Sequence, residues 1–406
     1  MTAATDATPV PTRVPWLALV SMLLVQAFVT MAAYSMSVVA PEVAAELGIE
    51  GSTIGLYTSL VYGFGMLSAV ASPGFIRRFG AIRTCQFSLL VASAGLAVAA
   101  FGPTALIVAL SALVIGSGYG VPAPSSSHVL AKRTPPRAMN LVFSARQTGV
   151  PFGGMFAGLI LPPLLLIIDW RSALLVEILP CLVLLVLLQG MRRRYDADRE
   201  PGRPLATRGI LGPLRLVVEN REIFRLSFAS FTYSGAQLCF GAFMVVYLND
   251  RIGYSIVAAG WALASFQIAG VVSRLIWGWL ADHYISPRVL LGILGLVMAA
   301  AAILFGQFAQ DWPVASILAV AALAGATGSG FTGLAFAEYA RLAGPERVAE
   351  GTGAGASIMF FGVMLMPGLF SGTIWLSSSY AVAYAGVAAL AAVSGLVLLA
   401  PGSNRA

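Results

Sequence analysis

The sequence predicts an all-α membrane protein in which twelve transmembrane helices form two pseudo-symmetric six-helix bundles. The composition, the lengths of the apolar segments and an internal repeat indicate this fold class. Of the 406 residues, 58% are hydrophobic and 10% are charged, and the mean hydropathy is +0.87. Soluble domains carry about 25% charged residues. We therefore expect the chain to reside in a lipid bilayer.

Apolar segments of about 20 residues follow one another along the chain, and each is long enough to cross a bilayer as a helix. The first six are expected at residues 16–40, 53–76, 84–101, 105–131, 138–167 and 171–190. The second six are expected at residues 223–248, 255–280, 289–309, 313–337, 352–374 and 379–400. These segments lack the alternating pattern of barrel strands, which excludes a membrane β-barrel.

The apolar segments divide the chain into five parts. We expect an N-terminal tail (1–15), a first bundle (16–190), a linker (191–222), a second bundle (223–400) and a C-terminal tail (401–406). The first apolar run is longer than the hydrophobic region of a signal peptide, so it is expected to be an uncleaved first span.

Basic residues predict the orientation, because Lys and Arg accumulate in the cytoplasmic loops of membrane proteins. Of the 24 Lys and Arg residues, Arg146 and Arg274 lie inside apolar segments, and Arg171 and Arg251 lie on one side. The others lie on the opposite side, which is therefore expected to be cytoplasmic and to hold both termini. The basic residues on the cytoplasmic side of a cell inner membrane account for the net charge of +7. The charge therefore gives no reason to expect a nucleic-acid partner.

The two halves of the chain resemble each other. At a constant offset of 205, Gly48, Gly55, Gly65 and Arg83 align with Gly253, Gly260, Gly270 and Arg288. The fifth and eleventh segments also match, with S-A-R-Q-T-G-V at 144–150 against S-I-M-F-F-G-V at 357–363. Two related six-helix halves are typical of secondary transporters with a central site.

A motif at the end of the eighth segment carries a family resemblance. In G-W-L-A-D-H, Gly278 stands four residues before Asp282, and this spacing resembles the loop signature of the major facilitator superfamily. The first half has a related loop, P-G-F-I-R-R-F-G at 73–80. The resemblance covers essentially the whole chain and implies alternating access. It implies gating or conformational roles for Gly278, Asp282, Arg288, Arg78 and Gly80.

The first-half loop departs from the family pattern. Pro73 and Arg77 stand where the family usually has Gly and Asp. We therefore do not expect the gating contact between the halves that the family forms through this aspartate.

A narrower resemblance lies in S-R-L-I-W-G-W-L-A-D, which is similar to the eighth helix of monocarboxylate and oxalate/formate transporters. It implies that Arg274 binds a substrate carboxylate. The Gly-rich run 116–120 is similar to their fourth helix. The chain departs at Gly270, where monocarboxylate transporters often have an acid, and in 352–375, where the oxalate antiporter has a lysine. Only Arg274 is carried over from this group.

Two cations are predicted deep in the membrane. Arg274 lies about 12 Å below the surface, and Arg146 lies roughly 13 Å deep, at 1.5 Å per helical residue. In the major facilitator fold their helices face each other, so an anion between the two guanidiniums would relieve their repulsion and accept bidentate hydrogen bonds. The alternatives are a structural Arg274 paired with a backbone carbonyl or a gate carboxylate, and an Arg146 that reaches the membrane surface.

Neutral polar side chains are expected to complete the binding site, because Tyr and Gln can hydrogen-bond the oxygen atoms of a substrate. Helix–helix contacts in membranes use the same residue types. The expected substrate-binding residues, besides the two arginines, are Gln147, Tyr34, Tyr119, Tyr233, Gln237 and Gln267.

Two residues are candidates for proton coupling. Glu177 is a carboxyl group within the sixth segment, where burial favours the protonated form. His128 belongs to a residue type that titrates near neutrality. The alternatives are a local hydrogen bond for Glu177 and a helix-end position for His128.

The expected function is secondary active transport of a small organic anion, in particular a monocarboxylate, coupled by proton symport or by exchange. The alternative of the same fold is a proton-coupled drug or metabolite efflux antiporter, which usually has a buried carboxylate in its first half; segments one to five contain none. A non-transporting receptor and an inorganic-anion carrier are further alternatives. The sequence shows no Ser/His/Asp set, metal cluster or nucleotide loop, so we expect that the protein is not an enzyme and binds no cofactor or metal. We also expect a monomer.

Overall fold

The computed structural model describes residues 12–48, 54–202, 204–205, 212–254 and 256–401. Within these ranges, 12 helices are long and apolar enough to cross a membrane. This confirms the predicted all-α fold. The expected tails and linker lie in part outside the described residues, at 1–11, 203, 206–211 and 402–406.

Six spans form the N-terminal bundle. Its helices are α1 (Trp16–Leu47), α2 (Ile54–Phe79), α3 (Ala81–Phe101), α4 (Ala105–Tyr119), α5 (Pro122–Ala131), α6 (Met139–Gln147), α7 (Gly149–Leu165) and α8 (Trp170–Gln189). The fourth span consists of α4 and α5, and the fifth consists of α6 and α7, preceded by the short helix η2 (Pro136–Ala138).

Six more spans form the C-terminal bundle, after the linker helices α9 (Arg192–Tyr195) and α10 (Gly212–Glu219). Its helices are α11 (Arg221–Val246), η3 (Tyr247–Arg251), α12 (Ile256–His283), α13 (Pro287–Gly306), α14 (Val314–Gly328), α15 (Thr332–Ala343), η4 (Pro345–Arg347), α16 (Val348–Ser377) and α17 (Tyr380–Leu399). The tenth span consists of α14 and α15.

The helices of the two bundles pack in the same pairs, as the internal repeat predicts. α1 packs on α7 as α11 packs on α16, α2 on α4 as α12 on α14, and α3 on α8 as α13 on α17. Gly48 and Gly253, which the repeat aligns, both have a positive φ, of 65° and 78°. Glycine adopts this left-handed conformation without the steric cost that other residues meet.

Three of the described spans are interrupted within their length, and proline or glycine residues mark each break. Pro122 follows the break between α4 and α5, and Pro151 follows the break between α6 and α7. Proline has no N–H, so the carbonyl four residues before it has no helical donor. The related sequences G-S-G-Y (116–119) and G-S-G-F (328–331) mark the breaks in the fourth and tenth spans. Interrupted helices leave backbone groups available for other partners.

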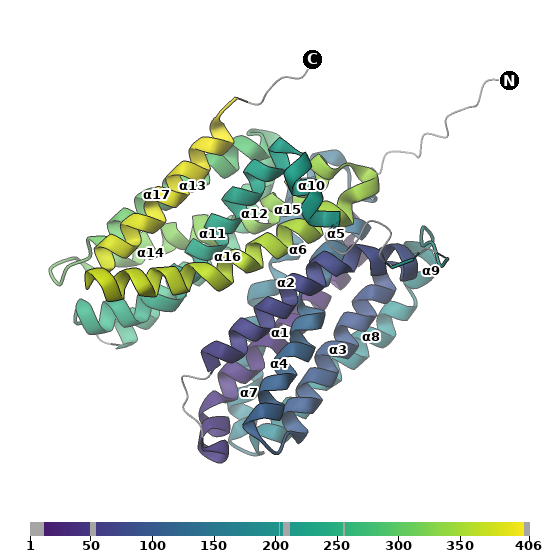
Figure 1. Ribbon diagram of the computed structural model, residues 1–406, viewed down its shortest axis with the longest axis horizontal. Helices are drawn as coiled ribbons and strands as arrows, with labels where there is room; N and C mark the ends of the chain where they lie inside the picture. The colour runs from purple at the N-terminus through teal and green to yellow at the C-terminus, as the bar shows by residue number, and fades with distance from the viewer. Residues whose placement is uncertain (1–11, 49–53, 203, 206–211, 255, 402–406) are drawn as a thin grey trace.

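The bundles meet at one end of the molecule and separate toward the other (Figure 1). The contacts between them join α6 to α12 and α15, and α16 to α2 and α5. The first residues of α1 and the last residues of α17 lie at the end where the bundles meet. We call this end the terminal side and the opposite end the far side. The bundles are therefore in contact on the terminal side and diverge toward the far side.

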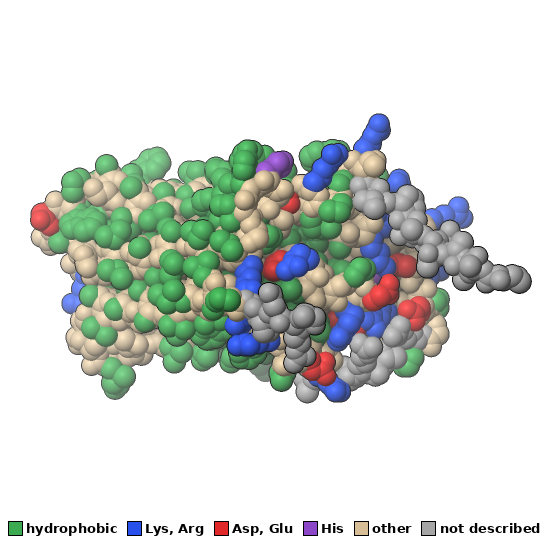
Figure 2. Space-filling model, turned by 90° about the horizontal axis from the view of Figure 1, so that it is seen from above, with side chains coloured by type: hydrophobic (Ala, Val, Ile, Leu, Met, Phe, Trp, Pro, Cys, Tyr) green, Lys and Arg blue, Asp and Glu red, His purple; other side chains and the backbone are tan. Residues whose placement is uncertain are grey.

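The charged side chains are distributed unevenly along the same axis. Figure 2 shows Lys and Arg gathered toward the terminal side, while hydrophobic side chains cover most of the remaining surface. This asymmetry agrees with the pattern from which the topology was predicted. The assignment of the terminal side to the cytoplasm stays a prediction.

Candidate functional site

A cavity of about 180 Å³ lies between the two bundles. Its walls come from α1, α2, α4, α5, α6 and α7 of the first bundle and from α11, α12, α15 and α16 of the second. The cavity brings together six of the eight predicted substrate-binding residues: Arg274, Gln147, Tyr34, Tyr119, Gln237 and Gln267. The structure places Arg146 and Tyr233 elsewhere.

Arg274 is held by neutral oxygen atoms. Its side chain is 2% exposed, and its Nε and Nη2 donate to the backbone oxygen and the hydroxyl of Ser329, at 3.0 and 2.9 Å. Its Nη1 donates to the backbone oxygen of Gln147, at 2.5 Å. Within the described ranges, no carboxylate forms an ion pair with this guanidinium. A positive charge of this kind, in the wall of a cavity, favours an anionic ligand.

The two partners of Arg274 both lie at helix breaks. Gln147 is the last residue of α6, and Pro151 cannot donate to its carbonyl, which leaves that oxygen for Arg274. Ser329 follows the last residue of α14. Because Gln147 belongs to one bundle and Arg274 to the other, this hydrogen bond also joins the bundles at the cavity wall.

Arg146 lies behind the cavity rather than in its wall, which corrects the expectation of two converging guanidiniums exposed to the ligand. The residue is 1% exposed, and it donates to the side-chain oxygens of Gln147 and of Gln26 on α1, the latter at 3.0 Å. Its guanidinium also lies 5.8 Å from the ring centre of Phe336. Arg146 faces the interior because its helix packs on α1 through this side chain.

Tyr233 lies inside the C-terminal bundle instead of the cavity. Its hydroxyl donates to the backbone oxygen of Leu291 on α13, at 3.1 Å. Its ring packs edge-on against Phe331, with centroids 5.3 Å apart. A Cβ atom on Gly295 would lie 1.9 Å from the Tyr233 hydroxyl, so this glycine makes room for the tyrosine. The polar group is therefore satisfied within the bundle.

An aromatic cluster in the cavity wall was not predicted. The rings of Tyr62, Tyr119 and Phe360 have centroids 5.4 to 5.7 Å apart, and Phe360 comes from the opposite bundle. The internal repeat is the signal that could have found two of them. Tyr62 stands 205 residues before Gln267, and Phe360 matches Gln147 in the alignment of the fifth and eleventh spans.

The two proton-coupling candidates lie away from the cavity wall. Glu177 on α8 is 1% exposed and hydrogen-bonds Ser35 on α1, the residue after the cavity residue Tyr34. His128 lies at the terminal-side end of α5 and hydrogen-bonds Asp198 of the linker, at 2.8 Å.

The linker carboxylate is held ionised by its neighbours. The hydrogen bond from His128 and the ion pair with Lys132 keep the pKa of Asp198 well below its usual range. His128 therefore lies near the end of α5 and connects this helix to the linker. This position agrees with the alternative interpretation of His128 as a helix-end residue.

One contact that closes the terminal side is built from Asp282. Its Oδ1 accepts from the backbone and side-chain nitrogens of Asn140, at 3.0 and 2.8 Å, and its Oδ2 accepts from the backbone nitrogen of Leu141, at 2.8 Å. A carboxylate at a helix N-terminus is stabilised by the unpaired N–H groups there. Gly278 permits this approach, because a Cβ atom on it would lie 2.8 Å from the Cα of Leu141. Asp282 and Gly278 thus join α12 to α6 across the bundles.

The second closing contact has the opposite polarity. Arg77 on α2 stands 205 residues before Asp282, and it forms an ion pair with Glu350 in the first turn of α16. Glu350 also pairs with Arg347, at 2.6 Å. The family resemblance predicted no gating contact at position 77, because the usual aspartate is missing there. The structure nevertheless shows a contact between the bundles at this position, with the arginine on α2 and the acid on α16.

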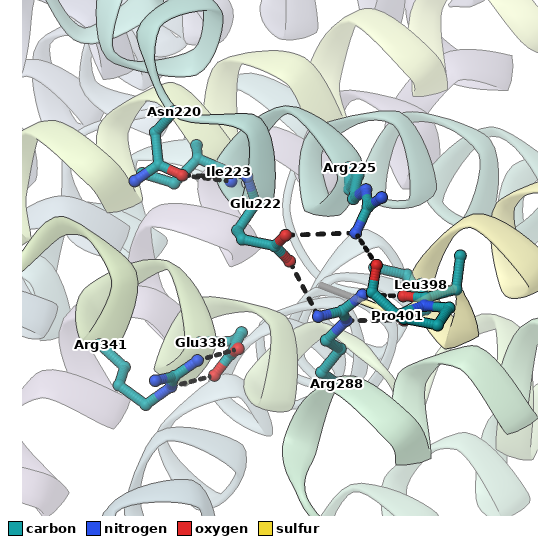
Figure 3. A network of polar contacts seen from close by, with 10 residues as sticks. Asn220, Glu222, Ile223, Arg225, Arg288, Glu338, Arg341, Leu398 and Pro401 are labelled. Carbon is teal, nitrogen blue, oxygen red and sulfur yellow. Dashed lines mark hydrogen bonds and ion pairs between the residues drawn. The ribbon is translucent and has the colours of Figure 1, made fainter. Parts of the chain in front are cut away.

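The three other predicted gating residues contact their own bundle or the linker. Gly80 has φ 94° and lies against Asp196, whose carboxylate accepts from the first N–H groups of α3. Arg78 lies over the ring of Phe79, 5.4 Å from its centre. Arg288 forms an ion pair with Glu222, at 3.1 Å, and its Nε donates to the backbone oxygen of Leu398 at the end of α17, at 2.7 Å (Figure 3).

Comparisons with known proteins agree with this architecture. The family model described as Major Facilitator Superfamily matches residues 22–309 and 226–405. The 4-hydroxybenzoate transporter of Pseudomonas putida is 24% identical over 302 residues, which cover 67% of each chain. A protein of Mycobacterium tuberculosis named as a probable nitrate/nitrite transporter is 30% identical over 146 residues, 36% of each chain.

Solved structures show the same fold. The crystal structure of a bacterial homologue of the iron transporter ferroportin, in an outward-facing state, matches with a TM-score of 0.74. The match covers 94% of this chain and 98% of that chain, at 16% sequence identity.

Proposed function

The chain belongs to the Major Facilitator Superfamily and is a secondary transporter, and we propose that its substrate is a small organic anion bound between the bundles through its carboxylate. The observation that carries this proposal is Arg274, a buried cation in the cavity wall. Its described partners are neutral oxygen atoms, so its charge is left for a ligand. Arginine matches a carboxylate through two parallel hydrogen bonds.

The aromatic cluster favours an aromatic carboxylate. Tyr62, Tyr119 and Phe360 offer ring faces and edges to the same cavity that contains Arg274. Offset-stacked and edge-to-face ring pairs contribute about 0.5–1.5 kcal/mol beyond the area that they bury. The name of the Pseudomonas putida relative, a 4-hydroxybenzoate transporter, supports the same substrate class.

The cavity supports a small substrate over a drug-sized one. Its volume of about 180 Å³ is below the range of about 300–1,000 Å³ that is usual for drug-sized ligands. The residues in its wall include one cation and no carboxylate. These features weigh against the efflux antiporter for cationic or apolar drugs.

Alternating access follows from the two bundles. In the observed arrangement the terminal side is closed by contacts of α6 and α16 with the opposite bundle. A substrate that binds residues of both bundles stabilises the arrangement in which the cavity is enclosed. The bundles then separate on the terminal side, and the substrate leaves there.

The first test of this function is uptake into proteoliposomes with a matched pair of labelled acids. Benzoate is expected to enter at least about 5-fold faster than cyclohexanecarboxylate, because a ring pair contributes about 1 kcal/mol. Benzamide, which has the same ring without the charge, is expected not to enter above the protein-free control. Equal uptake of benzoate and benzamide would contradict the anion proposal.

We propose proton symport with Glu177 as the proton carrier. The single hydroxyl hydrogen of Ser35 can satisfy either the backbone oxygen of Met31, at 2.7 Å, or Glu177. If it satisfies Met31, then a protonated Glu177 donates to Ser35. Ser35 lies next to Tyr34 in α1, so the proton site and the cavity share a helix.

An imposed pH gradient tests this coupling. A higher proton concentration on the substrate side should accelerate benzoate uptake by the wild type. Glu177→Gln, which keeps the hydrogen bond and removes the titratable carboxyl proton, should retain exchange of internal for external benzoate and lose the response to the gradient. A Glu177→Gln protein that responds to the gradient as the wild type does would remove Glu177 from the coupling.

A further inference from the structure

Arg146 is the largest fully buried side chain of the described part of the protein, and its contacts define its role. It donates to the side-chain oxygens of Gln147 and Gln26. Both glutamines line the cavity, whereas Arg146 does not. Arg146 therefore contacts two cavity residues from behind.

A guanidinium contains hydrogen-bond donors and no acceptor. Each glutamine must therefore turn its oxygen toward Arg146, which leaves its NH₂ group for other partners. The NH₂ group of Gln26 donates to Thr30, at 3.1 Å. Among the described residues, no acceptor is found for the NH₂ group of Gln147. Arg146 thus makes Gln147 a hydrogen-bond donor in the cavity wall.

Gln147 is fixed at a second point. Its backbone oxygen, which Pro151 leaves without a helical donor, accepts from Arg274. The side chain of Gln147 and the guanidinium of Arg274 therefore belong to one connected group of hydrogen bonds. They come from opposite bundles and line the same cavity.

We propose that Arg146 is a positioning residue, which orients the NH₂ group of Gln147 so that it donates a second hydrogen bond to the substrate anion that Arg274 binds. The inference rests on the proposed function, because it requires an anion at Arg274. The substrate then receives one donor from each bundle, which couples its binding to their relative position. Arg146 acts on the substrate through Gln147 and contributes no contact of its own.

The test is a double-mutant cycle on purified protein in detergent, with the dissociation constant of benzoate taken from its protection against heat. Gln147→Leu and Arg146→Met should each raise this constant about 10- to 100-fold, as expected for a hydrogen bond to a charged group. The double variant should bind no more weakly than either single variant. Arg146→Lys, which keeps a donor, should recover part of the affinity.

Two further variants complete the experiment. Arg137→Met removes the same charge from an exposed position nine residues earlier and should leave the dissociation constant unchanged. Gln147→Glu keeps an acceptor for Arg146, removes the NH₂ donor and adds a carboxylate that repels the anion, so it should fold and bind benzoate at least about 10-fold more weakly. If Arg146→Met fails to fold, Gln147→Glu still measures whether the NH₂ group of Gln147 contributes to binding.

The outcomes separate this inference from the proposed function. Additive effects of Arg146→Met and Gln147→Leu would identify Arg146 as a direct ligand and overturn the inference. A lower melting temperature of Arg146→Met with an unchanged dissociation constant would reduce its role to folding. Wild-type affinity of Gln147→Glu for benzoate would show that the NH₂ group of Gln147 donates no hydrogen bond to the substrate. If benzoate and the other carboxylates of a panel fail to protect the wild type, the proposed function fails, and the inference fails with it.

Discussion

Replacing Arg274 with alanine is expected to lower benzoate uptake at least about 100-fold. Removal of one partner from a buried, hydrogen-bonded charge pair costs about 2–5 kcal/mol, and about 3 kcal/mol corresponds to a factor of about 100. The loss should appear in the initial rate at low substrate concentration and in the heat protection of the purified protein by benzoate. Both measurements report the same missing contact with the anion.

Arg274→Lys separates charge from geometry. Lysine keeps the positive charge, but its single ammonium cannot reproduce the fork that reaches Ser329 and Gln147 together. We therefore expect an intermediate loss, about 10-fold, consistent with one hydrogen bond to a charged group. Arg251→Ala, at an exposed arginine of the same bundle, is the matched control and should transport at the wild-type rate. Undiminished uptake by Arg274→Ala would remove this residue from the site.

The spans and their internal repeat could be predicted from the sequence because membrane depth imposes simple rules. A helix must be apolar over about 20 residues to cross the bilayer. A glycine that must adopt a positive φ recurs at the same place in both halves, as Gly48 and Gly253 do. The partners at the breaks in the spans could not be predicted from the sequence. A proline such as Pro151 indicates a kink, but it does not show which neighbour hydrogen-bonds the carbonyl that is left without a helical donor.

The site was predicted in part. A lone cation in an apolar segment identifies Arg274, since its burial is costly without a function. The same rule applied to Arg146 identified a cation that the structure buries, but it did not show that the residue lies outside the cavity wall, because the direction of a side chain around its helix depends on packing. Tyr233 shows the same limit: its polar group is satisfied by Leu291 inside the bundle, and only the packing at Gly295 reveals this.

The gate illustrates how a departure from a family motif can be compensated elsewhere. Arg77 replaces the aspartate that the first-half loop usually has, and the sequence alone suggested a missing contact. The partner is Glu350, 273 residues away in the chain. The second half keeps an acid at the equivalent position, Asp282, which accepts from the N-terminus of α6. The two halves thus close the terminal side with opposite charges on their corresponding loops.

Reversing the charge at Arg77 is therefore expected to open the terminal side. In Arg77→Glu, a carboxylate faces Glu350 in place of a guanidinium, and the two positions are only 18% and 7% exposed in the wild type. Unit charges about 4 Å apart interact by about 4 kcal/mol at the effective dielectric of a protein surface. A net change of about 3 kcal/mol shifts a two-state ratio about 100-fold. The far side should close as the terminal side opens.

Spin labels on the two bundles measure this shift. Gly158→Cys on α7 and Gly372→Cys on α16 suit labelling, because added side chains there meet no atom within 4 Å. Arg77→Glu should shorten the distance between these labels, and the double variant Arg77→Glu/Glu350→Arg should restore it.

Arg347→Gln is the matched control. It removes a cation that pairs with Glu350 from within the same bundle. Its distance distribution should match that of the wild type. If Arg77→Glu leaves the distribution unchanged, or if the double variant fails to restore it, the ion pair does not hold the terminal side closed, and the remaining contacts between the bundles, such as that of Asp282 with α6, carry the closure.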